Sequence, residues 1–186
     1  MEERKGLYRS LGRIAWGYAL IYLNFNINAL DLLPDWAGWL LICSALPGLA
    51  GAGEPSAMLL RPLCVLLAGW EAVCWVLTAL GQPTELWGLW LIAAVLSLYV
   101  HFQLFTNLAS AAGRFGCPQR RSLLILRTVN VVFTTLLSLP LPLDEVDGWV
   151  AWVQVALVIV VIIWTIVVIN TFRASLRDGM GQAEAK

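Results

Sequence analysis

The sequence predicts an all-α integral membrane protein, built as a six-helix transmembrane bundle with both termini in the cytoplasm. Three observations predict it: long apolar stretches, short connections rich in turn-forming residues, and basic residues confined to one side. Of the 186 residues, 60% are hydrophobic, 13% are charged and ten are tryptophan. Soluble domains carry about 25% charged residues, so this composition is typical of a chain that folds in lipid. We expect a single transmembrane domain over residues 1–186.

The apolar stretches set the number of helices. A helix needs about 20 apolar residues to cross a hydrocarbon core of about 30 Å. Six stretches meet this requirement, at about 12–30, 36–52, 57–80, 86–112, 122–141 and 148–172. The connections between them are short and contain Pro, Gly and Asp, which favour turns. Neighbouring helices are therefore expected to run antiparallel.

The basic residues predict the orientation of these helices. Cytoplasmic connections of membrane proteins carry an excess of Lys and Arg. With six spans, all twelve Lys and Arg residues fall on one side of the membrane. The connections on the opposite side carry only acids, namely Asp31, Asp35, Glu85, Asp144, Glu145 and Asp147. Removing any one span would scatter this partition, so the partition supports the number of helices as well as their direction.

The three outer turns resemble one another in sequence. Residues 34–42, 83–92 and 142–152 each contain a proline, then an acid, then Trp and Gly at the start of a helix. The resemblance has two explanations. It is convergent, because Trp favours the headgroup level and Pro favours helix starts, or the bundle consists of three related hairpins, like the repeats of some transporters. Similar crossing geometry in the three helix pairs would favour the repeat.

Two ionisable side chains inside the predicted spans are candidates for a functional role. Glu71 lies about ten residues past Arg61, hence roughly 15 Å along its helix and near the middle of the membrane. Acids at this depth face the bundle interior or a wet cavity, so Glu71 is either a structural acid or a substrate-binding carboxylate. His101, the only histidine, has no partners at metal-ligand spacing. We interpret it as a satisfied interhelical hydrogen-bond donor.

Three stripes of polar residues follow the predicted helices. The first stripe is Asn24, Asn28 and Asp31, which share one helical face at i, i+4 and i+7. The second and third stripes are Tyr99, Gln103, Asn107 and Ser110, and Arg127, Asn130, Thr134 and Ser138. Such stripes can hold helices together by hydrogen bonds worth about 0.6 kcal/mol each. Alternatively, they can line a polar cavity that reaches Glu71.

The sequence lacks the motifs of several kinds of function. It contains no Gly-x-Ser-x-Gly, no His-Glu-x-x-His and no phosphate loop, so we expect no enzyme, no cofactor and no metal site. No block of like charges predicts nucleic-acid binding. Small residues allow close helix approach, and Ala15 with Ala19 and Gly48 with Gly51 predict surfaces for a protein partner or a second copy.

Residues 24–42 resemble a group of small bacterial membrane proteins. The segment reads Asn24-Phe-Asn-Ile-Asn28, then Asp31-Leu-Leu-Pro-Asp35-Trp-Ala-Gly38-Trp-Leu-Leu-Ile42. Members of the group have an Asn-rich first helix followed by (Ile/Leu)-x-Pro-Asp-aromatic-x-Gly-aromatic. The group has no assigned activity, so the resemblance implies a location in the bacterial inner (cytoplasmic) membrane and no mechanism. In architecture, the chain is also similar to the six-helix substrate-binding subunits of energy-coupling-factor transporters.

The predicted function is the binding or transport of a small molecule at a polar site in the outer half of the membrane. Acids, amides and tryptophans converge on that side, as in ligand pockets that combine apolar walls with a few polar groups. The expected ligand-binding residues are Asn24, Asn28, Asp31, Asp35, Glu71, Trp36, Trp39 and Trp87. The alternative is a non-catalytic accessory or regulatory subunit that binds another protein. An enzyme acting on lipid through Glu71 or Asp35 ranks third.

Overall fold

The computed structural model describes residues 2–22, 26–27, 30–31, 34–82, 87–138 and 148–184. Within these residues lie six α-helices: α1 (Glu2–Tyr22), α2 (Asp35–Gly51), α3 (Leu60–Ala79), α4 (Trp87–Arg114), α5 (Arg120–Ser138) and α6 (Gly148–Glu184). A 3-10 helix, η1 (Pro55–Leu59), leads into α3. Two-residue strands, β1 (Asn26–Ile27) and β2 (Leu30–Asp31), pair antiparallel between α1 and α2. The prediction of an all-helical architecture is confirmed.

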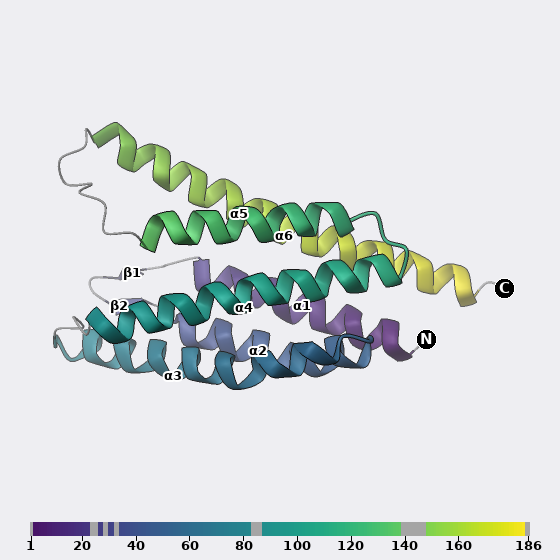
Figure 1. Ribbon diagram of the computed structural model, residues 1–186, viewed down its shortest axis with the longest axis horizontal. Helices are drawn as coiled ribbons and strands as arrows, with labels where there is room; N and C mark the ends of the chain where they lie inside the picture. The colour runs from purple at the N-terminus through teal and green to yellow at the C-terminus, as the bar shows by residue number, and fades with distance from the viewer. Residues whose placement is uncertain are drawn as a thin grey trace.

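The helices form an elongated bundle in which both ends of the chain lie at the same end (Figure 1). The most extensive packing joins α1 to α2, α4 to α5, α2 to α3, and α1 to α6. Three helical stretches are long and apolar enough to cross a membrane, namely Pro55–Ala79, Gly88–Arg114 and Val155–Gly181. By length and composition, these three helices confirm part of the membrane prediction.

The first helix differs from its prediction at both ends. It begins at Glu2 and ends at Tyr22, whereas residues 12–30 were expected. The reason is that Leu7, Leu11 and Ile14 recur at i, i+4 and i+7 and are fully buried, so the charged N-terminal segment is one face of a packed amphipathic helix. A search for an uninterrupted apolar stretch overlooks such a segment.

The polar face predicted for the first helix is also wrong. Asp31 lies in β2, where it pairs with Asn26 of β1, so it does not continue a helix. Asn24 and Asn28 lie outside the described residues. Because β1 and β2 lie between α1 and α2, Asp31 does not share a helical face with the residues of α1.

The other helices begin and end close to the predicted residues, except that α6 continues to Glu184 instead of ending near residue 172. Its extension has the same cause as that of α1. Phe172 and Leu176 are one turn apart and are both buried, so the packed face of α6 runs on past the last predicted residue. Two helices that pack on each other, α1 and α6, thus lengthen at the same end of the bundle (Figure 1).

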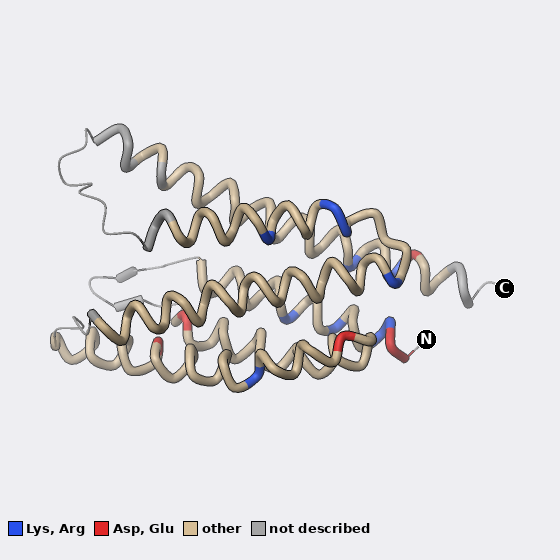
Figure 2. The backbone as a smooth tube through the Cα atoms, in the orientation of Figure 1, with Lys and Arg blue, Asp and Glu red and all other residues tan. Residues whose placement is uncertain are grey.

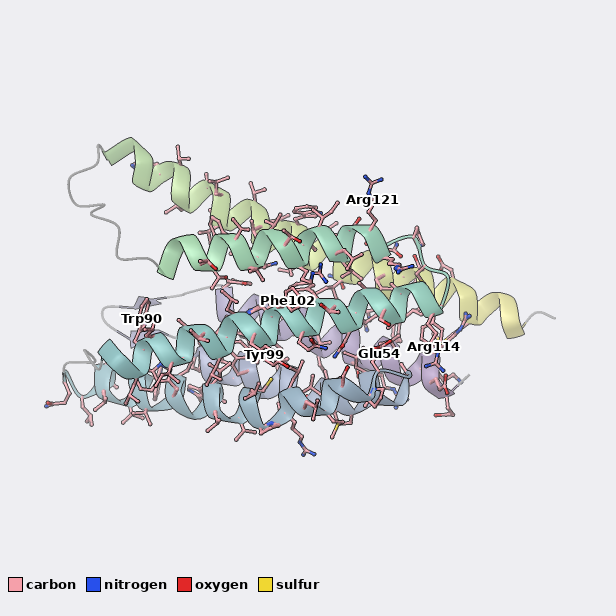
Figure 3. All side chains as sticks on the ribbon, in the orientation of Figure 1. Glu54, Trp90, Tyr99, Phe102, Arg114 and Arg121 are labelled. Carbon is pink, nitrogen blue, oxygen red and sulfur yellow. The ribbon has the colours of Figure 1, made fainter. Side chains whose placement is uncertain are left out.

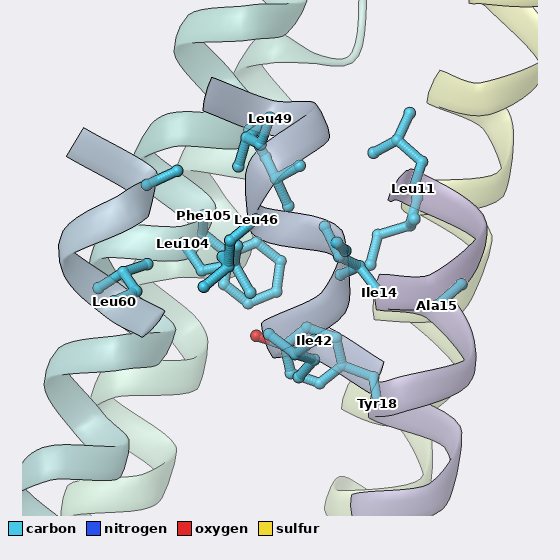
Figure 4. Packing of buried hydrophobic residues seen from close by; sticks show 14 of the residues in the cluster. Leu11, Ile14, Ala15, Tyr18, Ile42, Leu46, Leu49, Leu60, Leu104 and Phe105 are labelled. Carbon is cyan, nitrogen blue, oxygen red and sulfur yellow. The ribbon is translucent and has the colours of Figure 1, made fainter. Parts of the chain in front are cut away.

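The core contains buried residues from all six helices and from η1. It is built from large aliphatic and aromatic side chains at helical spacing (Figure 4). The labelled members are Leu11, Ile14, Ala15, Tyr18, Ile42, Leu46, Leu49, Leu60, Leu104 and Phe105, all buried. Outward faces are apolar as well: Leu66 of α3, Ile92 of α4 and Val160 of α6 are each more than half exposed. Contiguous exposed apolar faces are rare on soluble monomers and fit a lipid environment.

Glycines bring the backbones of α1 and α2 into contact. A Cβ atom on Gly38 would lie 2.6 Å from the carbonyl oxygen of Gly17, and one on Gly17 would lie 2.7 Å from Cγ1 of Ile42. A Cβ atom on Gly48 would overlap the side chain of Ser10. Gly48, predicted to face a partner, therefore packs inside the chain instead, because its missing side chain makes room for α1.

The charged residues are unevenly distributed along the bundle (Figure 2). The Lys and Arg residues drawn there extend from the middle of the bundle to the end that holds both termini. Among the coloured residues, the opposite end carries no Lys or Arg. The bundle therefore has a basic half and a half without basic charge, and we call these the basic half and the distal half.

The three helix pairs that were considered as repeats are packed differently. α1 and α2 are in close contact along their length, whereas α3 and α4, and α5 and α6, share much smaller interfaces. In Figure 1, α6 crosses behind α5 and its N-terminal part diverges from it. This difference gives no support to three hairpins of common geometry.

Candidate functional site

The structure separates the residues that were predicted to form one site. Asn24 and Asn28 lie outside the described residues, and of Asp31 and Trp87 the structure describes only the backbone, in β2 and at the start of α4. The other four are Asp35, Trp36 and Trp39 at the start of α2, and Glu71 on α3. Trp39 is buried, and the remaining three are half-buried.

Glu71 lies on the packed face of α3. It follows the buried residues Cys64, Leu67 and Ala68 at i+7, i+4 and i+3, so its side chain leaves the helix on the side that meets the bundle. Within the part of the chain that the structure describes, Glu71 makes no hydrogen bond and no ion pair. It is also not one of the residues that line the cavity described next.

A cavity of about 310 Å³ lies in the distal half, between α1, α4, α5 and α6. Its apolar walls are Ile21, Trp90, Phe133, Val158, Val161 and Ile162. Its polar lining consists of Tyr22, Ser97, His101, Asn130 and Thr134. Trp90 marks the distal end of α4 in Figure 3. Mostly apolar walls with a few polar groups are the usual composition of a small-molecule site.

A hydrogen bond across the bundle holds one side of this cavity. The Tyr22 hydroxyl of α1 donates to Oδ1 of Asn130 on α5, at 3.1 Å. Nδ2 of Asn130 donates to the carbonyl oxygen of Leu126, one turn earlier in α5, at 3.1 Å. Both the oxygen and one N–H of the Asn130 amide are thereby used, so the amide is fixed in orientation at the cavity wall.

His101 provides the opposite polar side. Its Nδ1 lies 2.7 Å from the carbonyl oxygen of Ser97 and 3.2 Å from the Ser97 hydroxyl. A carbonyl oxygen accepts only, so the short contact assigns the proton to Nδ1, and Nε2 of the neutral ring is then an acceptor. Nε2 is buried and has no hydrogen-bond partner among the described residues. The prediction of a satisfied interhelical donor is therefore wrong, because the donor bonds within its own helix.

Aromatic rings surround the imidazole. The ring centres of Trp39 and Tyr18 lie 5.3 and 5.4 Å from that of His101, and Trp39 meets it edge-on, with 76° between the planes. Tyr22 lies 6.4 Å from His101, and Phe105 stacks on Tyr18 at 5.5 Å. The Tyr18 hydroxyl is buried and, like His101 Nε2, has no hydrogen-bond partner among the described residues. Two unsatisfied polar atoms thus lie within one apolar cluster, which costs free energy unless something bonds to them.

Comparisons with protein-family models, with curated proteins and with solved structures found no match. The features of the molecule that bear on its function are this cavity, the charge distribution and the surface of the bundle.

The second predicted polar stripe serves to hold helices together. Oδ1 of Asn107 on α4 accepts hydrogen bonds from the hydroxyl of Ser56 in η1 and from Nε2 of Gln103, each at 3.0 Å. Asn107 is buried, whereas Tyr99 and Ser110 of the same stripe are exposed. The third stripe has both predicted roles. Asn130 joins α5 to α1 through its hydrogen bond with Tyr22. Asn130 and Thr134 also line the cavity.

Arg127 of the third stripe is accommodated by its neighbours on α4. Its guanidinium lies over the ring of Phe102, 4.7 Å from the ring centre, and its Nη1 is 3.4 Å from the Thr106 hydroxyl. Figure 3 shows Phe102 on the side of α4 that approaches α5. The cation–π contact stabilises the guanidinium. Its Nε is buried without a hydrogen-bond partner among the described residues, and Arg127 does not line the cavity.

The sequence analysis missed three members of the site, Tyr18, Tyr22 and Ser97. Each has a signal at helical spacing that could have indicated it. Tyr18 and Tyr22 are one turn apart on α1 and stack at 5.8 Å, and Ser97 precedes His101 by one turn. In the described part of the chain, no three His, Cys, Asp or Glu residues gather in metal-binding geometry.

Proposed function

We propose that this protein is a small-molecule binding or transport subunit of the bacterial inner membrane, with six transmembrane helices and both termini in the cytoplasm. The charge distribution supports the topology. The basic half holds both termini, and Lys and Arg mark the cytoplasmic side of membrane proteins (Figure 2). The cavity in the distal half then faces the outer half of the bilayer.

The observation that carries the proposed binding activity is the unsatisfied acceptor of His101, which lines the cavity, next to a second unsatisfied atom on the neighbouring Tyr18. His101 Nε2 offers an acceptor, and the Tyr18 hydroxyl offers a donor and an acceptor, within aromatic walls. A volume of about 310 Å³ is at the small end of the range for ligand pockets. The best ligand is thus compact, flat and mostly apolar, with one N–H or O–H group that donates to His101.

Reporter fusions test the topology. A reporter that is active only in the cytoplasm is fused after Lys186 or inserted after Gln82, and a reporter that is active only outside is placed at the same two positions. We expect the cytoplasmic reporter to be active after Lys186 and the external reporter to be active after Gln82. Activity of one reporter at both positions would contradict six spans with this orientation.

A thermal-shift experiment tests the binding site. The probe is indole, a flat molecule with one N–H donor, added to the protein purified in mild detergent. We expect indole to raise the melting temperature of the wild type and of Tyr99→Phe, an exposed control on the same helix. His101→Leu should abolish the shift, because the acceptor is lost. Loss of the shift in Glu71→Gln together with its retention in His101→Leu would move the site to α3 and overturn the assignment.

A further inference from the structure

A groove of about 470 Å³ runs along the outside of the bundle between α1 and α6. Its floor is apolar and is formed by Ala15 and Ala19 of α1 and Ile166 of α6. Trp16, which is 69% exposed, forms one wall. Asn170 and Arg173 of α6 lie toward the basic half, together with Gly12 of α1. The groove therefore has an apolar stretch and one polar, cationic end.

Arg173 is held in place but its charge is not paired. Its guanidinium lies over the ring of Tyr8, 4.2 Å from the ring centre. The guanidinium carbon is 3.3 Å from the position of a Cβ atom on Gly12, so this glycine leaves the space that the guanidinium occupies. Nε of Arg173 is buried without a hydrogen-bond partner among the described residues. In the same residues the only ion pair joins Arg177 to Asp178, so no acid neutralises Arg173.

Further basic residues add to the charge at this end. Lys5 and Arg9 lie on the same face of α1 as Gly12 and Trp16, at helical spacing. Arg173 lies over Tyr8, and Arg4 lies against Gly179 of α6, so these cations are at the same level as the last turns of α6. Both termini lie at this end of the bundle (Figure 1). An anion that enters the groove end thus meets an unpaired guanidinium within a positive field.

We propose that the groove binds one anionic phospholipid, with its phosphate on Arg173 and Asn170 and an acyl chain along the Ala15–Ala19 floor beside Trp16. The planar guanidinium suits the bidentate recognition of phosphate oxygens. Basic pockets between transmembrane helices on the cytoplasmic side are typical sites for anionic headgroups. A second protein helix in the groove would have to bring a buried acid to Arg173, whereas the lipid carries its anion at the membrane surface. The inference rests on the proposed orientation and not on the His101 cavity.

Native mass spectrometry and thermal stability test this site. The protein in detergent is titrated with phosphatidylglycerol or with phosphatidylcholine. We expect one phosphatidylglycerol to bind and to raise the melting temperature, and phosphatidylcholine to do so more weakly. Arg173→Gln should weaken phosphatidylglycerol binding about fivefold, the equivalent of about 1 kcal/mol per basic residue. Arg121→Gln is the matched control, because Arg121 points away from the bundle on α5 (Figure 3). Equal weakening in both variants would overturn the site.

A second pair of variants tests the chain-binding part without altering charge. Trp16→Ala should weaken phosphatidylglycerol binding, whereas Trp152→Ala, which removes a 76% exposed tryptophan from α6, should leave it unchanged. Inorganic phosphate that stabilises the wild type as strongly as phosphatidylglycerol would show a free-anion site and overturn the lipid assignment. A lipid-independent dimer that Trp16→Ala dissociates would show that the groove is a protein interface, which also overturns it. His101→Leu should bind the lipid like the wild type, so the two proposals fail separately.

Discussion

Two regions of the bundle hold their helices together in opposite ways. One is the interface of α1 with α2, and the other is the distal half, where α1, α4, α5 and α6 meet. Between α1 and α2, Gly17, Gly38 and Gly48 let the backbones touch, and no space remains. In the distal half, Tyr22 reaches Asn130 by a side-chain hydrogen bond, and an open cavity lies between the helices. Without a water-driven hydrophobic force, close packing and hydrogen bonds are what join helices in lipid.

These two kinds of helix contact have different consequences for the stability of the fold and for ligand binding. A glycine contact stabilises because it maximises dispersion contacts, and it leaves nothing for a ligand to touch. A long side chain such as Tyr22 bridges two helices while keeping them apart, so its reach makes the room that a ligand uses. We therefore expect substitutions at the α1–α2 interface to change folding, and substitutions in the distal half to change binding with less effect on folding.

The largest effect is expected from adding one methyl group at the glycine contact. Gly38→Ala places its Cβ 2.6 Å from the Gly17 carbonyl oxygen, so the helices must move apart. The free energy of unfolding, measured by titration with a denaturing detergent, should fall by about 1–3 kcal/mol, as is usual for overpacking. Gly69→Ala on α3 is the matched control, since nothing lies within 4 Å of its Cβ position. An equal loss in the two variants would mean that the close contact does not stabilise α1 on α2.

A smaller effect is expected at the buried amide of the basic half. Asn107→Leu removes the acceptor shared by Ser56 and Gln103, and it leaves both donors without that partner. The free energy of unfolding should fall by about 1 kcal/mol, within the range for hydrogen bonds between membrane helices. The control, Ser110→Leu, changes an exposed residue of the same helix and should have no effect. If Asn107→Leu is as stable as the wild type, the polar stripe of α4 does not hold η1.

The hydrogen bond that holds the distal half should contribute still less. Tyr22→Phe removes only the hydroxyl that donates to Asn130, and about 0.6 kcal/mol of stability should be lost. Tyr99→Phe removes an exposed hydroxyl from α4 and is the control. The two variants are compared in the same detergent titration. A loss for Tyr22→Phe as large as that for Gly38→Ala would erase the distinction between the two regions.

The architecture was predictable from the sequence because it depends on local properties. The bounds of α2 to α5 follow from apolar length and from turn residues, and both are read directly along the chain. α1 was misplaced because Leu7 and Leu11 are buried on a helix whose other face is charged, so only its periodicity, and not its mean hydropathy, indicates the helix. The same reason explains the part of α6 that continues past Phe172.

The candidate site was predictable only in its residue types. His101, Asn130 and Thr134 were recognised as polar groups inside apolar helices, but their meeting with Tyr22 depends on how four helices rotate and which of them are neighbours. Tyr22 and Asn130 are separated by 108 positions in the chain. No spacing rule within one helix connects them. The acids that were expected at the site are instead in β2, at the start of α2 and on α3.

The smallest effect on folding is expected where the structure already has space. Thr134→Leu adds volume to a cavity of about 310 Å³, so the free energy of unfolding should change by no more than about 0.5 kcal/mol. Ala45→Leu adds more volume at a fully buried position of α2 and should cost about 1–3 kcal/mol. Thr134→Leu should nevertheless reduce the thermal shift caused by indole, because it occupies the space of the ligand, while Tyr99→Phe should not. A large loss of stability in Thr134→Leu would mean that the cavity is already filled by side chains in solution. Unchanged stability together with loss of the indole-induced thermal shift would instead place the binding site in the loosely packed distal half.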